Sequence, residues 1–111
     1  DMDCLFCKII AGEIPCTKVY EDDKVFAFRD INPQAPVHVL ALPKKHMANI
    51  LECDGETAQA LAAAVQTIAR QEGVAEDGFR LVNNCGKNGA QTVNHLHIHV
   101  LGGGKLSVSM A

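Results

Sequence analysis

Near its end the chain reads NHLHIHVL at residues 94–101, where histidines alternate with apolar residues. Successive side chains of a β-strand point to opposite faces, so the alternation predicts a strand with His95, His97 and His99 on one face and an apolar row turned to the core. Each imidazole is a potential base, nucleophile or metal ligand near neutral pH. The stretch therefore predicts both a half-buried strand and a functional site.

The rest of the sequence predicts an α+β fold. Four further runs have the composition of short strands: residues 17–20, 24–30, 37–42 and 79–84. Apolar side chains recur at the helical period between Asp54 and Gly73, two residues that suit the start and the end of one long helix. Residues 4–12 predict a short N-terminal helix. The short connections favour an antiparallel sheet of about five strands with the long helix against one face.

The composition is that of one ordinary globular domain, which we place at residues 1–111. Hydrophobic residues make up 48% and charged residues 21% of the chain, and the net charge of -3 provides no general attraction to nucleic acid or to an anionic membrane. An odd number of cysteines, no secretory signal and no apolar run long enough to span a bilayer favour reduced thiols. We expect a cytoplasmic protein without nucleic-acid or membrane partners.

Three histidines on one strand face suit two chemistries, metal binding and nucleophilic attack. No Asp or Glu follows Asp77, whereas a catalytic or oxygen-preferring metal site usually includes a carboxylate. A neutral imidazole is a good nucleophile toward phosphorus, and neighbouring imidazoles oppose one another's protonation. We expect His97, the middle ring, to attack, with support from His99 and from His38 on a neighbouring strand.

A polar loop with two glycines, residues 85–90, precedes Gln91 and Thr92. Backbone amides in such a loop can approach a phosphate closely, and a hydroxyl with a carboxamide adds donors or passes a proton to a leaving group. We therefore expect dipoles at this loop to hold an anion.

At residues 91–101 the chain resembles the signature of the histidine-triad (HIT) superfamily. Four earlier segments resemble its Hint branch, the histidine-triad nucleotide-binding proteins: residues 6–10, 13–15, 28–36 and 42–46. The tail lacks the Trp-Pro-rich end of eukaryotic members, so the chain is more similar to a bacterial Hit protein. The resemblance implies a HIT-like fold, a homodimer and a purine nucleotide of the AMP or GMP type as ligand. It also implies a hydrolase that cleaves the P–N bond of purine nucleoside phosphoramidates through a nucleotidyl-histidine intermediate.

The resemblance also implies roles for individual residues. The catalytic residues that it implies are His97, His99, His38 and Thr92. The nucleotide-binding residues that it implies are Phe6, Ile14, Phe28, Asp30, Ile31, Leu40, Asn84, Gln91, Thr92, His97 and His99. Asp30 would accept hydrogen bonds from the ribose hydroxyls, and the apolar members would form a slot for the base. Asn84, Gln91 and Thr92 would contact the phosphate or the leaving group.

A second site is implied by bacterial members of the superfamily and consists of Cys4, Cys7, His46 and His95. Two thiolates and two imidazoles suit tetrahedral zinc, and a closed shell of four protein ligands is structural rather than catalytic. Alternatively, the two cysteines are buried small hydrophobic residues on one face of the first helix. We expect a structural zinc ion and no organic cofactor.

Several other functions stay open on the sequence. A dinucleotide polyphosphate hydrolase keeps all three histidines, but the segments before them favour the Hint branch. A nucleotidyltransferase of the same superfamily typically has glutamine in place of the third histidine, which is His99 here. A non-catalytic nucleotide-binding regulatory module would retain the same pocket, and a metalloenzyme would use the three histidines as ligands.

Overall fold

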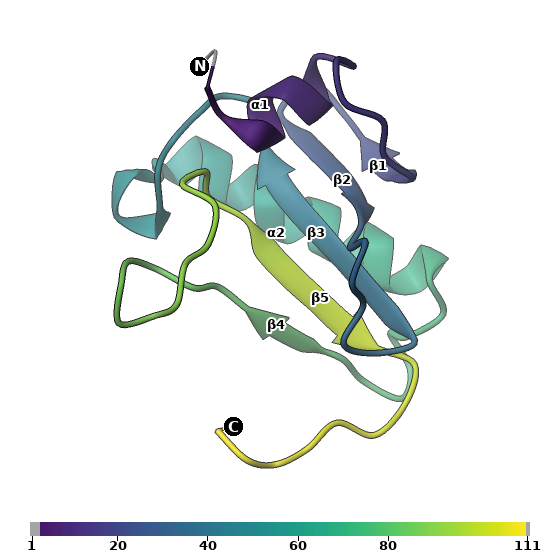
Figure 1. Ribbon diagram of the computed structural model, residues 1–111. Coiled ribbons are helices and arrows are strands. Elements are labelled where there is room, and N and C mark those ends of the chain that lie inside the picture. Colours follow the sequence, from purple (N-terminus) through teal and green to yellow (C-terminus); the bar gives the residue numbers. More distant parts are fainter. Residues whose placement is uncertain (1–2, 111) are drawn as a thin grey trace.

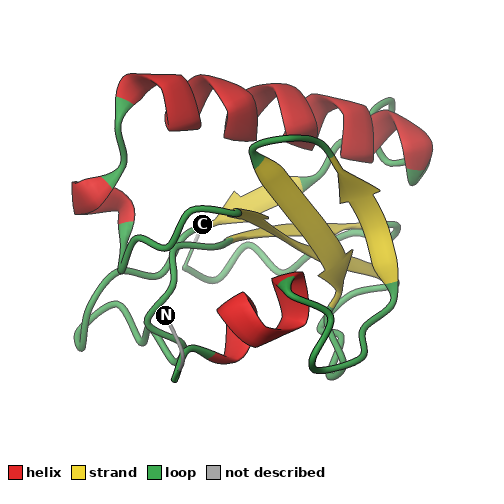
Figure 2. Cartoon of the chain, turned by 90° about the horizontal axis from the view of Figure 1, so that it is seen from above, coloured by secondary structure: helices red, strands yellow, loops and turns green. Residues whose placement is uncertain are grey.

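The computed structural model describes residues 3–110, which form three layers (Figures 1 and 2). A five-stranded antiparallel sheet lies in the middle, the long helix α2 (Gly55–Gln71) crosses one face, and the short helix α1 (Leu5–Ile10) lies against the other. The strands are β1 (Lys18–Glu21), β2 (Val25–Arg29), β3 (Val37–Pro43), β4 (Arg80–Val82) and β5 (Ile98–Gly102). Their order across the sheet is β1-β2-β3-β5-β4. The predicted α+β fold is confirmed.

The histidine stretch does not form the strand that the alternation predicts. β5 begins at Ile98, so His95 and His97 precede the strand and only His99 lies within it. The expectation that one strand face carries all three rings was therefore wrong. The prediction that the alternating apolar residues face the core is confirmed for Leu96, which is fully buried.

Pro43 explains why the pairing of β5 with β3 stops where it does. Ala41 pairs with Ile98, and the same register would place Leu96 opposite Pro43. Proline has no N–H to donate to a ladder. The Pro43 carbonyl instead accepts a hydrogen bond from the Nε2 atom of His95 at 2.8 Å. The chain before β5 is thus held by this side-chain bond, and by the N–H of Leu96, which donates to the carbonyl of Met47 at 2.8 Å, rather than by pairing with β3.

α2 begins and ends where the sequence predicts. Asp54 is the N-cap, and its Oδ1 atom accepts the N–H of Thr57 at 2.7 Å. Gly73, just past the last turn, has a φ of 72°, a left-handed conformation that glycine adopts without strain. Among residues 3–110 neither helix is long and apolar enough to cross a bilayer.

The sheet is buried on both faces, because each face is covered by a helix. Alternation along β2 and β3 divides their side chains between two cores. The core under α2 includes Val25, Ala27, Val39, Ala41, Leu61, Val65, Ile68, Leu96 and Val100. The core under α1 consists of Phe6, Ile9, Phe26, Phe28, Leu40 and Leu42. His38 and His99 lie on the α1 side, so this face of the sheet carries the polar chemistry.

The loop between β4 and β5 is tightly folded. β4 ends at Val82, two residues earlier than the sequence predicts. A Cβ atom at Gly89 would collide with the backbone of Cys85, so only glycine fits at this close approach. Ala90 has a φ of 61° and is held in the left-handed region. An L-residue with a Cβ is strained in that conformation.

Candidate active site

A cleft of about 890 Å³ opens on the α1 face of the sheet. It is lined by most of the predicted nucleotide-binding residues: Phe6, Ile14, Phe28, Asp30, Ile31, Leu40, Thr92, His97 and His99. These residues come from α1, the segment after it, β2, the connection from β2 to β3, β3, β5 and the chain that leads into β5. The fold thus brings together side chains that are up to about ninety positions apart in the sequence.

His97 is fixed in one tautomer by the backbone. Its Nδ1 atom lies 2.7 Å from the carbonyl oxygen of His95. A carbonyl can only accept, so Nδ1 of the neutral ring carries the hydrogen and donates it. The lone pair is therefore on Nε2, and the ring lines the cleft. The tautomer of His97 is thus set by a backbone group and not by another side chain.

His99 and His38 form a hydrogen-bonded relay behind the cleft. The backbone N–H of Gln34 donates to Nδ1 of His38 at 3.0 Å, so the hydrogen of the neutral His38 ring is on Nε2. This Nε2–H donates to Nδ1 of His99 at 2.9 Å. His99 then carries its own hydrogen on Nε2. Through this relay His38 sets the tautomer of His99, whose ring lines the cleft with its hydrogen on Nε2.

Burial keeps both relay rings neutral near pH 7. Burial is the main cause that lowers the pKa of His99 to about 4; the neighbouring rings of His97 and His38 add to it, and the carboxylate of Asp30 opposes it. Burial also lowers the pKa of His38, and the carboxylate of Asp30 opposes that effect. Crowding of the imidazoles therefore lowers the pKa of His99, but desolvation is the larger cause.

Asp30, His38 and His99 lie close enough together to be considered as a metal site. The Oδ2 atom of Asp30 is 3.4 Å from Nε2 of His38. However, the backbone bond from Gln34 places the hydrogen of His38 on that same Nε2, which leaves no lone pair for a metal. The hydrogen bonds therefore favour a proton relay over a metalloenzyme.

Asn84 and Gln91, two of the predicted nucleotide-binding residues, do not line the cleft. They hydrogen-bond within the loop before Thr92 instead. Asn84 donates from Nδ2 to the carbonyl of Gly89 at 2.7 Å. Gln91 accepts the N–H of Gly86 at 2.9 Å and donates to the carbonyl of Ala48 at 2.7 Å. These bonds fix the path of the chain into Thr92, whose side chain lines the cleft.

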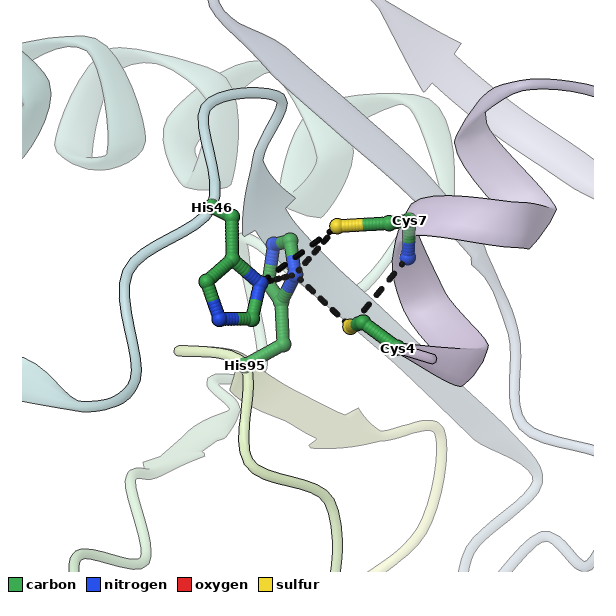
Figure 3. Close-up of side chains that lie close together, drawn as sticks. All are labelled: Cys4, Cys7, His46 and His95. Carbon is green, nitrogen blue, oxygen red and sulfur yellow. Dashed lines mark hydrogen bonds between the residues drawn. The ribbon is translucent and has the colours of Figure 1, made fainter. Parts of the chain in front are cut away.

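A second cluster of side chains joins α1 to the segment after β3 and to the segment before β5 (Figure 3). Cys4 is the N-cap of α1 and Cys7 lies within it, whereas His46 follows β3 and His95 precedes β5. All four side chains point toward one another, and their donor atoms lie within 4.8 Å. The structure thus brings together the four residues that the resemblance implies for a metal site.

The geometry of this Cys–His cluster fits a tetrahedral ion. Nδ1 of His95 is 3.3 Å from Sγ of Cys4, 3.5 Å from Sγ of Cys7 and 3.2 Å from Nδ1 of His46. Zn–N and Zn–S bonds of ordinary length place tetrahedral ligand atoms about 3.3 to 3.8 Å apart. Because Nε2 of His95 donates to a backbone carbonyl, its Nδ1 keeps the lone pair that a metal requires.

Comparison with known proteins agrees with this geometry. The profile of the HIT domain matches residues 11–106. The chain belongs to the HIT family. It is 46% identical to the purine nucleoside phosphoramidase of Escherichia coli K12, over 98% of this chain and 94% of that protein. It is 47% identical to a 14 kDa zinc-binding protein of Zea mays, over 96% of this chain and 87% of that protein. The solved structure of a histidine triad protein from Clostridium difficile superimposes with a TM-score of 0.91 at 48% identity, over 96% of each chain.

The expected HIT-like fold and the resemblance to the Hint branch are thereby confirmed for this HIT protein. Two residues of its site were not predicted. Gln34 sets the tautomer of the relay through its backbone N–H, and no sequence pattern marks that role. Asn83 donates from Nδ2 to the carbonyl of His97 at 2.9 Å and holds the backbone at His97. The sequence placed Asn83 inside the predicted strand at residues 79–84, so no signal marked this role.

Proposed function

We propose that this HIT protein hydrolyses purine nucleoside phosphoramidates. The observation that carries the proposal is the fixed tautomer of His97. It leaves the lone pair on Nε2 of a ring that lines a cleft with both apolar and polar side chains. The relatives that cover nearly the whole chain include one named purine nucleoside phosphoramidase, which supports the same reaction.

The reaction proceeds in two displacements at phosphorus. Nε2 of His97 attacks the α-phosphorus, the P–N bond breaks, and the nitrogen leaves as an amine after it takes a proton from Nε2–H of His99 or from the hydroxyl of Thr92. Water then attacks the nucleotidyl-histidine. It releases the nucleoside monophosphate, restores the lone pair on His97, and returns the proton to the group that gave it.

The cleft supplies a site for each part of a purine nucleotide. Phe6, Phe28 and Leu40 are buried apolar side chains at the α1 end and suit the flat faces of a base, with Ile14 and Ile31 at the rim. The carboxylate of Asp30 only accepts hydrogen bonds, so it suits the two ribose hydroxyls. Thr92 offers a hydroxyl to the phosphate, and Asn84 and Gln91 hold the loop that positions it.

We also propose that the Cys–His cluster holds zinc. Four protein ligands would close the coordination shell, so the ion would serve the structure by tying α1 to the chain before β5 rather than by activating water. The zinc-binding relative from Zea mays supports this choice of metal. A homodimer, which rests on the family resemblance, and a cytoplasmic location, which rests on the cysteine usage, complete the proposal.

Steady-state hydrolysis of an adenosine phosphoramidate tests the reaction. The wild-type protein should release AMP and amine in equal amounts, and His97→Ala should abolish turnover while AMP still binds within about threefold. Gln66→Ala, on the exposed face of α2, is a matched control that should keep full activity. Wild-type turnover in His97→Ala would show that His97 is not the nucleophile. Binding of AMP without any wild-type turnover would instead favour a regulatory module.

A further inference from the structure

We propose that the Cys–His cluster and the nucleotide cleft form one cooperative unit, in which an ion at the cluster positions Phe6 for nucleotide binding. This inference rests on the proposed function and goes beyond a purely structural role for the ion. Phe6 is the shared element, because it lies in α1 between Cys4 and Cys7 and its ring lines the cleft.

The ring of Phe6 connects the nucleophile, the base slot and the cluster. Its centroid is 5.0 Å from that of His97 with the planes at 88°, an edge-to-face contact. It is 5.6 Å from the ring of Phe28, on the wall of the base slot, and 6.0 Å from the ring of His95. Any displacement of α1 would therefore alter the contact with His97 and the width of the slot at the same time.

The position of α1 depends on the cluster as well as on the packing of Phe6 and Ile9 against the sheet. The helix has six residues, too few to be stable on their own in water. Its two thiols face His46 and His95, which belong to two other segments of the chain (Figure 3). The core between α2 and the sheet contains no α1 residue among those the structure describes, so that core does not need the helix. Loss of the ion should loosen α1 while the rest of the fold persists.

His95 itself should move little when the ion is lost. Its Nε2 atom remains bonded to the carbonyl of Pro43 at 2.8 Å, and its own carbonyl holds Nδ1 of His97 at 2.7 Å. His97 thus keeps its tautomer, whereas Phe6 moves with α1 and loses its fixed position against His97 and the base slot. The ion should consequently affect nucleotide affinity more than the rate of the chemical step.

Coupling between two binding sites is reciprocal, and it commonly amounts to a 5- to 150-fold change in affinity, on the order of 1 to 3 kcal/mol. Isothermal titration of AMP into the zinc-loaded full-length protein and into the chelator-treated protein measures one direction. Competition with a chromogenic zinc chelator, with and without saturating AMP, measures the other. We expect AMP to bind at least fivefold more weakly without zinc, and AMP to strengthen zinc retention by the same factor.

Two variants of α1 identify the path of the coupling. Phe6→Leu keeps an apolar side chain but removes the ring, so the coupling should fall below about twofold while zinc affinity without AMP stays close to that of the wild type. Ile10→Val, in the same helix and outside the cleft lining, should keep the full coupling. Amide NMR spectra of the zinc-free protein should retain the signals of α2 and change those of α1.

The outcomes separate this inference from the proposed function. Equal AMP affinity with and without zinc, full coupling in Phe6→Leu, or collapse of the α2 signals on zinc removal would each overturn the cooperative unit. If neither AMP nor GMP binds the zinc-loaded protein, the proposed function itself is wrong.

Discussion

Mild acid should destabilise this protein, and His99 should account for part of the effect. The pKa of His99 is lowered from 6.5 to about 4 in the folded protein, so the ring is neutral there while the unfolded chain takes up a proton below pH 6.5. The unfolded state then binds more protons, and the free energy of unfolding falls as the pH decreases from about 6.5 toward 4. Protonation would also remove the lone pair on Nδ1 that accepts the hydrogen bond from His38.

The size of this effect follows from the pKa difference. Between pH 7.5 and pH 4.5, a fully desolvated ring would contribute about 2.6 kcal/mol. His99 is half-buried, and solvent screening reduces the expected contribution to on the order of 1 to 2 kcal/mol. Urea unfolding of the wild type and of His99→Gln at the two pH values isolates it, because glutamine keeps a hydrogen-bonding side chain but does not titrate. Gln66→Ala, which retains all five histidines, should keep the wild-type pH dependence. Equal losses of stability in wild type and His99→Gln would refute the reasoning.

Three further substitutions test other parts of the structure. Asp30→Asn should weaken AMP binding about tenfold and remove the preference for AMP over its 2′-deoxy analogue, measured by calorimetry, because a charged acceptor is lost; an unchanged preference would show that Asp30 does not contact the ribose. Ala90→Gly should raise the free energy of unfolding by about 0.5 to 1 kcal/mol, since relief of left-handed strain exceeds the added entropy of the unfolded chain. A lower urea midpoint would contradict that balance. Asp54→Ala should cost about 1 kcal/mol in the same assay through loss of the N-cap, and no change would mean that water satisfies the first turn equally well.

Local patterns in the sequence were sufficient for α2 and for most of the sheet. Asp54 and Gly73 mark the ends of the long helix because capping depends on neighbours within one turn. The start of β5 could not be found in this way. It depends on Pro43, which lies opposite Leu96 only once β3 and β5 have paired, and that pairing is between distant parts of the chain.

The sequence indicated which residues gather at the candidate site, but not the contacts that fix each of them there. The alternation of histidines and the family resemblance indicated His97 and the four members of the Cys–His cluster. The tautomer of each ring depends on a backbone group from elsewhere in the fold, such as the carbonyl of Pro43 or the N–H of Gln34. Such contacts leave no trace in a sequence pattern, because any residue type with a free backbone group can make them.

The most direct test of the central claim is detection of the covalent intermediate. The protein is mixed with an adenosine phosphoramidate, quenched in alkaline denaturant within milliseconds to preserve the acid-labile phosphoimidazole, and digested for tandem mass spectrometry. We predict an adenylyl group on the peptide that contains residues 95–99, with fragment ions that place it on His97 and no adduct in His97→Ala. An adduct on another residue, or rapid turnover without any adduct, would contradict nucleophilic attack by His97.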